Sequence, residues 1–600
     1  MIHAFLVFLV FGVYANSLFN GFVSDDIQGI VQAGPTWTLG SVFTDTFFLT
    51  RWTRILHFFI YQLVGLSPWA YRLVNITCHA VSVLLVYKIV FQLVNQSKPH
   101  RLPISKPLHF YASYPLFIAF LVSALFAVHP IIIESVTWIA GGVYTQYGMF
   151  FLLSFWLYIM GRGRRTEDGG RKFDRFFPFS AFCLPLSYII YCICLLFSEK
   201  AGVLFLLFFL YEFCFGNLKK NWRKLMPYFI VSCIFILFYM TQLNSRIAGV
   251  TQVSGAGGSM YNPLIQLPVA LSSYFYLIFW PKNLTLYHQE VPIVGTADYV
   301  FRVLTVCLYM FGIAFTAVKN RKLCFWLVWF IIPLIPTITP LKISWLVAER
   351  YAYLSVIGIF VLIAYGFEWV IHHFCFLESA ARVFPRPTSS PRSNSRSFWK
   401  SFDHIKTFMP FFQWSSGTSR DSGRSTGVPR HALQTLTKTF LCISIWVFIL
   451  CIYLSLIMRT VVRNQDWQSE DALWIATSKT SPSIPFTWNN MGDVYSRHKD
   501  YKKAAEMFQR AISLSPNSAD YYHNLGETYR DMGEIGDAIL MYEKALALNP
   551  NLWQSHGALA GIYYNKKDYQ TALLHIEEAL KIVPDNRMLL QAREQLRKMQ

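Results

Sequence analysis

The sequence predicts an all-α protein in which a polytopic bundle of membrane-spanning helices is followed by an α-solenoid of short repeats. Composition is the first reason, because 54% of the 600 residues are hydrophobic and only 14% are charged, whereas soluble domains carry about 25% charged residues. The second is a series of long apolar runs that extends from the N-terminus to residue 458. The third is a pattern that recurs every 34 residues in the C-terminal part. A single soluble globule, a disordered chain and a disulfide scaffold are excluded.

Eleven segments are long and apolar enough for a transmembrane helix, which needs about 20 largely apolar residues. They are residues 2–19, 71–94, 110–129, 143–160, 178–197, 201–216, 226–243, 299–318, 323–340, 351–371 and 439–458. The first has no basic stretch before it and no cleavage motif after it, so we expect an uncleaved span. A further apolar segment, 264–281, contains Pro268 and Pro281. Because proline interrupts helices, we expect this segment to re-enter the membrane or lie at its surface.

Basic residues indicate which ends of the spans face the cytosol. The first 464 residues have a net charge of +22, and residues 465–600 have one of −2. The excess of Lys and Arg lies in five loops between the apolar segments. If the N-terminus is cytosolic, all five loops lie on the cytosolic side of the membrane, as the positive-inside rule requires. The opposite, lumenal side then holds residues 20–70, 130–142, 198–200, 244–298, 341–350 and everything after 459.

Four regions follow from this arrangement. Residues 1–371 form a multispanning membrane domain, and residues 372–436 form a basic cytosolic loop whose Ser and Arg content is typical of disorder. Residues 437–460 contain the last span. Residues 465–600 form the lumenal repeats.

The C-terminal pattern places aromatic, small and proline residues at matching positions of three units, 485–518, 519–552 and 553–586. In the first unit these are Trp488, Met491, Gly492, Tyr495, Ala504, Phe508, Ala511 and Pro516. The spacing is typical of the tetratricopeptide repeat, in which small residues let two helices approach and aromatic residues fill the groove between them. Trp474 and Pro482 continue the register, so we expect a half repeat before the array. The chain ends soon after the third unit, which is compatible with a short array or with an incomplete chain.

Four groups of charged residues stand at the predicted lumenal ends of spans. They are Asp25 with Asp26, His129 with Glu134, Glu199 with Lys200, and Glu349 with Arg350. Each group alone has an ordinary interpretation as a helix cap, an interfacial side chain or a neighbouring ion pair. Together they predict an active site at the membrane surface, where a carboxylate can act as a general base and an arginine can bind phosphate.

Motifs for other chemistries are missing. No G-x-x-x-x-G-K-S/T loop is present, so a soluble nucleotide substrate is not indicated and a lipid-borne substrate fits better. Cysteine and histidine spacings do not indicate zinc, and a need for a divalent metal stays open. Among the sequons only Asn283-Leu284-Thr285 lies in a predicted lumenal loop, so Asn283 is the candidate N-glycosylation site.

Four ordered motifs add a family resemblance. They are FVSDD at 22–26, GLSPWAYRLVN at 65–75 with His79, HPIIIESV at 129–136, and AERYAYL at 348–354. Together with the spans and the repeats, these motifs resemble the transmembrane and tetratricopeptide repeat-containing (TMTC) family, which consists of multispanning C-type glycosyltransferases of the endoplasmic reticulum membrane. The resemblance covers nearly the whole chain except residues 379–430.

The resemblance implies a protein O-mannosyltransferase with a C-type glycosyltransferase-like bundle of about eleven spans and one re-entrant segment. Such an enzyme takes mannose from dolichyl-phosphate mannose and transfers it to Ser or Thr of lumenal proteins, with cadherin-type domains as the acceptor class. Asp25 and Asp26 would form its acidic pair, one of them as general base, and the repeats would hold the acceptor protein. The donor and the substrate would be bound by His129, Glu134, Glu199, Lys200, Glu349 and Arg350.

The chain departs from the family's pattern at three places. Glu199-Lys200 stand where the family has K-E, an R-P dipeptide is missing near residues 51–54, and Ser355 replaces a proline.

Two other functions compete with the enzyme. A membrane-anchored adaptor would bind partner proteins through the repeats without catalysis and would not need the acidic pair. A transporter or lipid flippase would show inverted repeats and charges at mid-membrane. We find no such repeat and few such charges, so this function ranks last.

Overall fold

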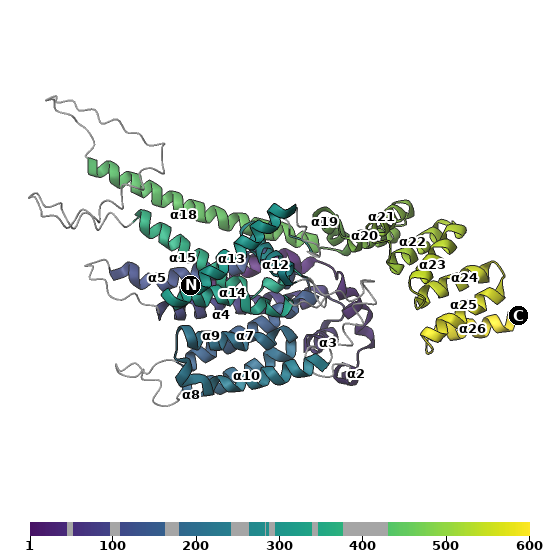
Figure 1. Cartoon of the computed structure of the whole chain (residues 1–600), viewed down its shortest axis with the longest axis horizontal. Coiled ribbons are helices and arrows are strands. Elements are labelled where there is room, and N and C mark those ends of the chain that lie inside the picture. Colours follow the sequence, from purple (N-terminus) through teal and green to yellow (C-terminus); the bar gives the residue numbers. More distant parts are fainter. Residues whose placement is uncertain are drawn as a thin grey trace, which may run out of the picture. The chain divides into compact units, whose positions relative to one another are not determined.

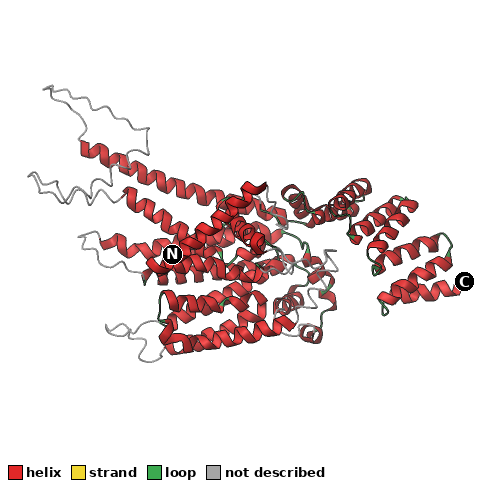
Figure 2. Ribbon diagram, viewed as in Figure 1, coloured by secondary structure: helices red, strands yellow, loops and turns green. Residues whose placement is uncertain are grey.

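A computed structural model of the chain describes residues 1–44, 52–96, 108–162, 179–241, 263–282, 284–286, 295–338, 346–375 and 430–599. Within these ranges every regular element is a helix, as the sequence predicts (Figures 1 and 2). The chain divides into two units, one formed by residues 1–364 and 455–600 and one by residues 365–454. The second unit contains the end of helix α15 (Val356–Cys375) and most of helix α18 (Arg430–Arg463).

Judged by length and composition, six helices of the described chain could cross a membrane, or seven if a bent pair counts as one span. They are Ile2–Phe19, Pro68–Asn95, Ala140–Gly161, Leu218–Thr241, Gly295–Lys319, Phe440–Trp467 and the pair Tyr114–Val128 with Pro130–Val136. The pair bends by 53° at His129-Pro130, because proline cannot donate a helical hydrogen bond. The predicted total of about eleven spans is not confirmed.

Other predicted spans correspond to shorter helices. Apolar helices cover Phe182–Phe197 in α8 (Phe179–Phe197), Leu264–Phe279 in α12 (Pro263–Phe279) and Val356–Ile371 in α15. The predicted span 201–216 is wrong, because Glu199–Val203 is a 3-10 turn and α9 (Phe205–Cys214) has only 10 residues. A helix of that length covers about 15 Å, half of the hydrocarbon core.

The predicted span 323–340 is also interrupted. Its α-helix, α14 (Arg321–Ile331), ends where a 3-10 turn at Ile332–Thr337 begins. Pro333 and Pro336 lie in this turn and supply no backbone N–H, so the α-helical ladder cannot continue through it.

Helix α4 (Pro68–Asn95) packs against α1 (Ile2–Tyr14), α5 (Leu108–Val128) and α7 (Val143–Gly161) at the centre of the helix packing. Helix α7 in turn packs along α8, while α9 contacts α10 (Leu218–Thr241), and α13 (Gly295–Lys319) contacts both α12 and α14. Glycine permits some of these contacts, since a Cβ atom on Gly148 of α7 would lie 2.7 Å from the Tyr353 ring.

The C-terminal residues form the predicted repeats. They comprise α20 (Pro485–Arg497) with α21 (Tyr501–Leu514), α22 (Ala519–Met532) with α23 (Ile535–Leu548), and α24 (Trp553–Asn565) with α25 (Tyr569–Ile582). Helix α19 (Glu470–Thr480) precedes them, with Trp474 buried, and α26 (Arg587–Met599) follows. The repeat glycines allow the close approach within each pair, because a Cβ on Gly492 would lie 2.6 Å from the Phe508 ring.

A layer of short helices joins the ends of the spans. It includes a π-helical turn at Ile27–Gln32, 3-10 turns at Pro130–Ile132, Ala140–Gly142, Glu199–Val203 and Glu349–Ala352, and helix α3 (Trp52–Val64). Hydrogen bonds connect residues 20–26, 134–140, 349–350 and 463–468 within this layer. Lys200 is hydrogen-bonded to Tyr144 at the start of α7, and His129 to the N–H of Ile131. All four predicted groups of charged residues therefore lie on one side of the bundle.

Candidate active site

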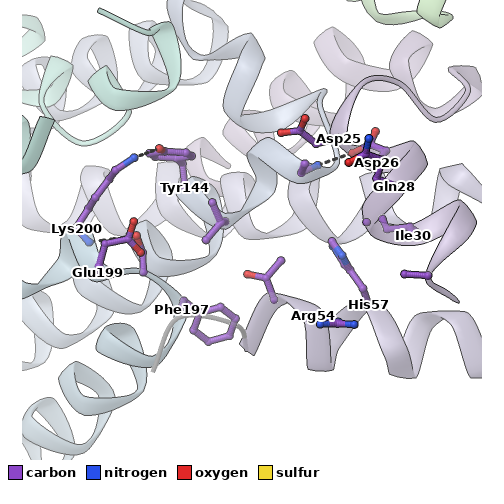
Figure 3. Close-up of a pocket in the computed structure, with 16 residues that line it drawn as sticks. Asp25, Asp26, Gln28, Ile30, Arg54, His57, Tyr144, Phe197, Glu199 and Lys200 are labelled. Carbon is purple, nitrogen blue, oxygen red and sulfur yellow. Dashed lines mark hydrogen bonds between the residues drawn. The ribbon is translucent and has the colours of Figure 1, made fainter. Parts of the chain in front are cut away.

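A cavity of about 660 Å³ lies in this layer (Figure 3). Its walls are formed by the loop after α1, by helix α3, by the start of α7 and by the turn after α8. Asp25, Asp26, Glu199 and Lys200 line it, and the two dipeptides face each other from opposite ends of the cavity in Figure 3. The structure thus brings together half of the charged residues that the sequence singles out. The other half, His129, Glu134, Glu349 and Arg350, lie outside the cavity wall.

Asp26 holds the loop that carries the acidic pair. Its side chain is buried, and its two carboxylate oxygens accept hydrogen bonds from the backbone N–H of Val23 at 3.2 Å and of Ala140 at 2.8 Å. Ser24 adopts a φ of +53°, which few non-glycine residues do. The loop therefore turns tightly, with Asp26 directed into the protein and Asp25 exposed to the cavity.

Arg72 supports the same loop from helix α4. Its guanidinium is fully buried and donates to the carbonyls of Asn20, Gly21 and, at 2.9 Å, Thr137. These bonds join the start of the loop to the segment that follows Glu134. Asn75, which comes later in the same helix, donates to the carbonyl of Trp138 at 3.2 Å. The 65–75 motif therefore stabilises the segments around the cavity but does not line it.

The pKa values of both adjacent carboxyl groups are raised. Burial raises the pKa of Asp26 to about 7, although its two backbone hydrogen bonds and the charge of Arg72 oppose the shift. Enclosure by the cavity also raises the pKa of Asp25, while Arg350 and Ser24 lower it. An ordinary aspartate has a pKa of about 3.9. A raised pKa makes the exposed Asp25 a better proton acceptor for a bound hydroxyl group.

Lys200 brings a positive charge to the other end of the cavity. Its ammonium group donates to the Tyr144 hydroxyl and lies 4.0 Å from the centre of the Tyr351 ring. Such cation–π contacts orient an ammonium group without neutralising it. Ser198 caps the turn by accepting from the N–H of Lys200 at 3.3 Å, which sets the direction of the dipeptide. The swapped order of Glu199 and Lys200 thus places an ammonium group against the aromatic wall.

Helix α3 contributes cavity residues that our sequence reasoning missed. Thr53, Arg54 and His57 line the cavity, while Phe59 and Leu63 on the opposite side of the helix are exposed. Burial lowers the pKa of His57 to about 4, so its imidazole is neutral at pH 7. The signal was present as an amphipathic pattern over residues 52–64, which has a polar and an apolar face at helical spacing.

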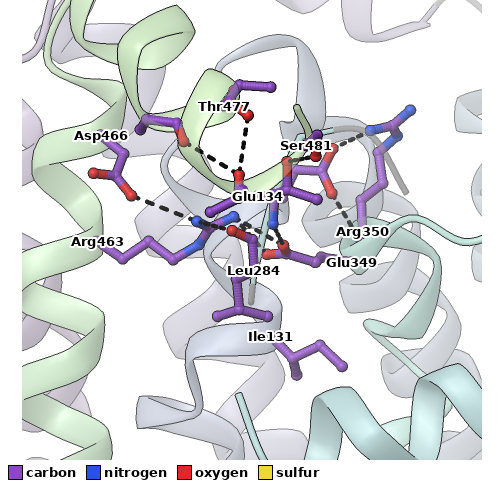
Figure 4. Close-up of polar contacts among 12 residues, drawn as sticks. Ile131, Glu134, Leu284, Glu349, Arg350, Arg463, Asp466, Thr477 and Ser481 are labelled. Carbon is purple, nitrogen blue, oxygen red and sulfur yellow. Dashed lines mark hydrogen bonds and ion pairs between the residues drawn. The ribbon is translucent and has the colours of Figure 1, made fainter. Parts of the chain in front are cut away.

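A second cluster contains three of the other four predicted residues, Glu134, Glu349 and Arg350 (Figure 4). Glu134 is fully buried and pairs with the Arg350 guanidinium, and it also accepts the backbone N–H of Arg350 at 2.9 Å. Glu349 is also fully buried, and its carboxylate accepts from Arg463 at 2.8 and 3.0 Å. Two buried ion pairs therefore lie side by side, each with additional hydrogen bonds that a buried charge needs.

Arg463 is a buried residue of this cluster that the sequence reasoning also missed. It is the last residue of helix α18, after the predicted span 439–458, where a long basic side chain ordinarily reaches the membrane surface. In the structure it donates to Glu349, to the Leu284 carbonyl at 2.8 Å and to Asp466 at 3.5 Å. Only its partner, 114 residues earlier in the chain, distinguishes it from an ordinary flanking arginine.

His129 has a local role at the bend of α5. Its Nδ1 accepts from the backbone N–H of Ile131 at 3.3 Å, so its Nε2 carries the proton and donates to the Ile278 carbonyl at 2.9 Å. Both ring nitrogens are therefore used by the backbone. The imidazole caps the turn after the bend and connects it to α12.

The cavity and the second cluster meet at Tyr351. The Lys200 ammonium lies 4.0 Å and the Arg350 guanidinium 5.2 Å from the centre of this ring. The charge of Arg350 also reaches Asp25, whose pKa it lowers. Arg350 can thus influence the cavity electrostatically while its own guanidinium is occupied by Glu134.

Asn283, the candidate N-glycosylation site, lies outside the described residues. Among the residues that are described, no group of three or more His, Cys, Asp and Glu side chains has an arrangement that could hold a metal ion.

The repeats resemble those of known proteins. Models of the tetratricopeptide repeat family match residues 484–551 and 523–587. Among solved structures, the Arabidopsis OM64 TPR domain is 21% identical, and the match covers 19% of this chain and 95% of that chain with a TM-score of 0.19. The MamA protein is also 21% identical, with 22% of this chain and 71% of that chain covered and a TM-score of 0.20.

Two curated proteins match along most of the chain. Both carry the name Protein O-mannosyl-transferase TMTC3, one from Mus musculus and one from Homo sapiens, and each is 21% identical over 546 residues. The match covers 84% of this chain and 50% of each relative. The chain therefore spans about half the length of the curated relatives that it matches.

Proposed function

We infer that this chain, whose resemblance to the TMTC family is confirmed by its curated relatives and its tetratricopeptide repeats, is a membrane-bound mannosyltransferase. We propose that it takes mannose from dolichyl-phosphate mannose and transfers it to Ser or Thr hydroxyls of lumenal proteins, such as cadherin-type domains, at the endoplasmic reticulum membrane. The observation that carries the proposal is the cavity that combines the acidic pair with Lys200 at the ends of the spans.

Asp25 is the general base of this proposal. Its carboxylate is exposed to the cavity, whereas both oxygens of Asp26 are occupied by backbone N–H groups. The acceptor hydroxyl gives its proton to Asp25 as its oxygen forms a bond to the anomeric carbon of mannose. The bond between that carbon and the phosphate oxygen breaks, and dolichyl phosphate leaves with the electron pair.

Positive side chains of the cavity stabilise the leaving phosphate. Lys200 and Arg54 line the wall, so their charge acts where negative charge develops on the phosphate oxygens. Arg350 is bound to Glu134 and lies outside the wall, so we assign it a longer-range electrostatic role in place of direct phosphate contact. Neutral His57 and Thr53 remain as hydrogen-bonding groups for the sugar hydroxyls.

The proposal is tested by mannose transfer in microsomes that lack other enzymes of this kind. Radiolabelled dolichyl-phosphate mannose and a folded cadherin-type domain are supplied to wild type, Asp25→Asn and Lys200→Met at matched amounts of protein. Loss of the base lowers kcat by about 100-fold or more while the KM of the donor changes little. Lys200→Met lowers kcat through weaker stabilisation of the leaving group.

A matched control for Lys200→Met is Lys219→Met, which removes an exposed ammonium group at the start of α10, outside the cavity lining, and leaves transfer unchanged. Full activity of Asp25→Asn would contradict its assignment as the base. If the wild type binds the acceptor but transfers no mannose, the chain acts as a membrane-anchored adaptor through its repeats.

A further inference from the structure

We propose that the segment 463–468, which connects helix α18 to helix α19, positions the loop of the acidic pair, and that Asn464 is its main positioning residue. This inference rests on the proposed function for its effect on catalysis. Its structural part, the attachment of the loop to this segment, stands on contacts alone. Neither the family motifs nor the charge pattern includes Asn464.

Asn464 connects three distant parts of the chain. Its side-chain amide donates to the Val13 carbonyl at 3.0 Å and to Oδ1 of Asn16 at 2.8 Å, and its Oδ1 accepts from the Thr137 hydroxyl at 2.8 Å. Its backbone carbonyl accepts from the Asn20 side chain at 2.8 Å. The residue is fully buried, so removal of its side chain would cost the Thr137 hydroxyl, the Asn16 amide oxygen and the Val13 carbonyl this partner. The bond from Asn20 to the Asn464 backbone carbonyl would remain.

The contacts continue from Asn464 to the acidic pair. Arg72 binds the Thr137 carbonyl with its Nε and the carbonyls of Asn20 and Gly21 with its two terminal nitrogens. The N–H of Gly21 donates to the Gln468 carbonyl at 2.8 Å. Both ends of the segment therefore touch the residues that shortly precede Asp25 and Asp26.

Arg463 forms the second arm of the segment. It pairs with Glu349, the neighbour of Arg350, so the segment also borders the second cluster. Close by, the hydroxyls of Thr285 and Ser481 lie 2.7 Å apart and tie the end of α19 to the same layer. The segment is thus held to the acidic loop by Asn464 and to the Glu349 side by Arg463.

The segment connects the repeats to the loop that carries the acidic pair. Helix α19 begins at Glu470, just after Gln468, and packs directly on the first repeat helix α20. A force on the repeats, such as the binding of an acceptor protein, reaches the acidic loop through these bonds. A displacement of the base by about 1 Å can cost about 100-fold in rate, so weak positioning appears in kcat more than in KM.

The experiment compares Asn464→Ala with Thr460→Val in the full chain. Thr460 is equally buried and its hydroxyl donates to the Val128 carbonyl at 2.6 Å, so the control loses a buried hydrogen bond near the segment without a contact to the acidic loop. Hydrogen exchange of peptides that cover residues 18–27 and 137–141 is measured first. We expect exchange about 10-fold faster in Asn464→Ala and unchanged in Thr460→Val.

Thr137→Val is a second variant for the case in which Asn464→Ala does not fold. It removes only the hydroxyl that donates to Asn464 and leaves the Thr137 carbonyl for Arg72. The double variant should exchange about as fast as Asn464→Ala alone, because that substitution already removes the contact with the Thr137 hydroxyl.

Mannose transfer gives the second readout. Asn464→Ala should lower kcat by about 10- to 100-fold with the donor KM within about twofold, and Thr460→Val should lower neither. Unchanged exchange in Asn464→Ala and Thr137→Val, or an equal loss of kcat in Thr460→Val, would overturn the inference. If no form of the protein transfers mannose but exchange responds as expected, the proposed function fails while the attachment of the loop stands.

Discussion

Asp25 and Asp26 are neighbours in the chain, yet their carboxyl groups have different surroundings. Asp26 is enclosed and bound to Val23 and Ala140, while Asp25 faces the cavity. The left-handed backbone of Ser24 produces this divergence, since it turns the chain just before the pair. One residue can therefore shape the loop while the other remains available for chemistry.

The first prediction at this scale concerns the pH dependence of transfer. Burial raises the pKa of Asp26 to about 7 and also raises that of Asp25, and the base must be ionised to accept a proton. We expect kcat to rise with pH, with a midpoint above the value of about 3.9 of an ordinary aspartate. Initial rates between about pH 4 and 8.5 measure it. A midpoint near pH 4 would contradict the enclosed environment of the pair.

The second prediction concerns how the stability of the folded protein depends on pH. The folded-state pKa of Asp26, about 7, exceeds that of the unfolded chain, about 3.9. The folded protein therefore binds more protons between these values, and stability decreases as the pH rises from about 4 to about 7. Asp26→Asn should remove this contribution. Unfolding midpoints in detergent at pH 5 and pH 8 should thus differ more for wild type than for the variant. Equal differences would show that Asp26 titrates normally.

Among the helices, the glycines of the tetratricopeptide repeats differ in how closely a neighbouring helix approaches them. A Cβ on Gly526 of α22 would lie 2.9 Å from the Tyr542 ring of α23, whereas Gly561 of α24 has no atom within 4 Å of such a Cβ. The first glycine therefore permits helix packing, and the second only adds freedom to the unfolded chain.

These glycines give a matched pair of variants. Gly526→Ala should destabilise the protein by about 1–3 kcal/mol through overpacking, and Gly561→Ala should stabilise it by up to about 1 kcal/mol through helix propensity. Thermal unfolding of the full chain, followed by helical circular dichroism, distinguishes them. Equal effects of the two substitutions would argue against the close packing of α22 on α23.

Helix α3 shows how one element can serve two environments. Its polar face carries Thr53, Arg54 and His57 into the cavity, and its other face exposes Phe59 and Leu63. Residues 65–67 join α3 to the start of α4, one of the helices long enough to span a membrane. The arrangement keeps a wall of the cavity close to the ends of the spans.

At the scale of the whole molecule, the acidic loop and the start of the repeats share one side. Gly21 is hydrogen-bonded to Gln468, and Asn20 to Asn464. Such bonds cannot form across a bilayer, so the first and last spans must end on the same side.

This sidedness gives a prediction about glycosylation. Met588→Thr, at an exposed position of the repeats, places a threonine two residues after Asn586 and so creates a sequon there. If the repeats are lumenal, the variant gains an N-glycan that endoglycosidase removes, which a gel shift detects. The natural sequon at Asn95 lies on the predicted cytosolic side and should stay unmodified. A glycan at Asn95 without one at Asn586 would reverse the orientation.

Sequence reasoning worked where a property is local. Apolar runs, the repeat period and charged residues at span ends can be read without a partner, and these predicted the helical class, the repeats and the cavity residues Asp25, Asp26, Glu199 and Lys200. It failed at 201–216, where hydropathy alone could not reveal that a 3-10 turn shortens the helix to α9.

Local sequence patterns identify the kind of protein: apolar helices, tetratricopeptide repeats and a set of charges at the ends of the helices. Which of these charges come into contact depends on the folded chain. Glu134 and Arg350 are 216 residues apart, and Thr137 and Asn464 are 327 apart, yet each pair is in direct contact. The physical reason is that hydropathy and period are properties of neighbouring residues. The burial of a carboxyl group, its ion pairs and its pKa depend on residues that are distant in the sequence and become its neighbours when the chain folds.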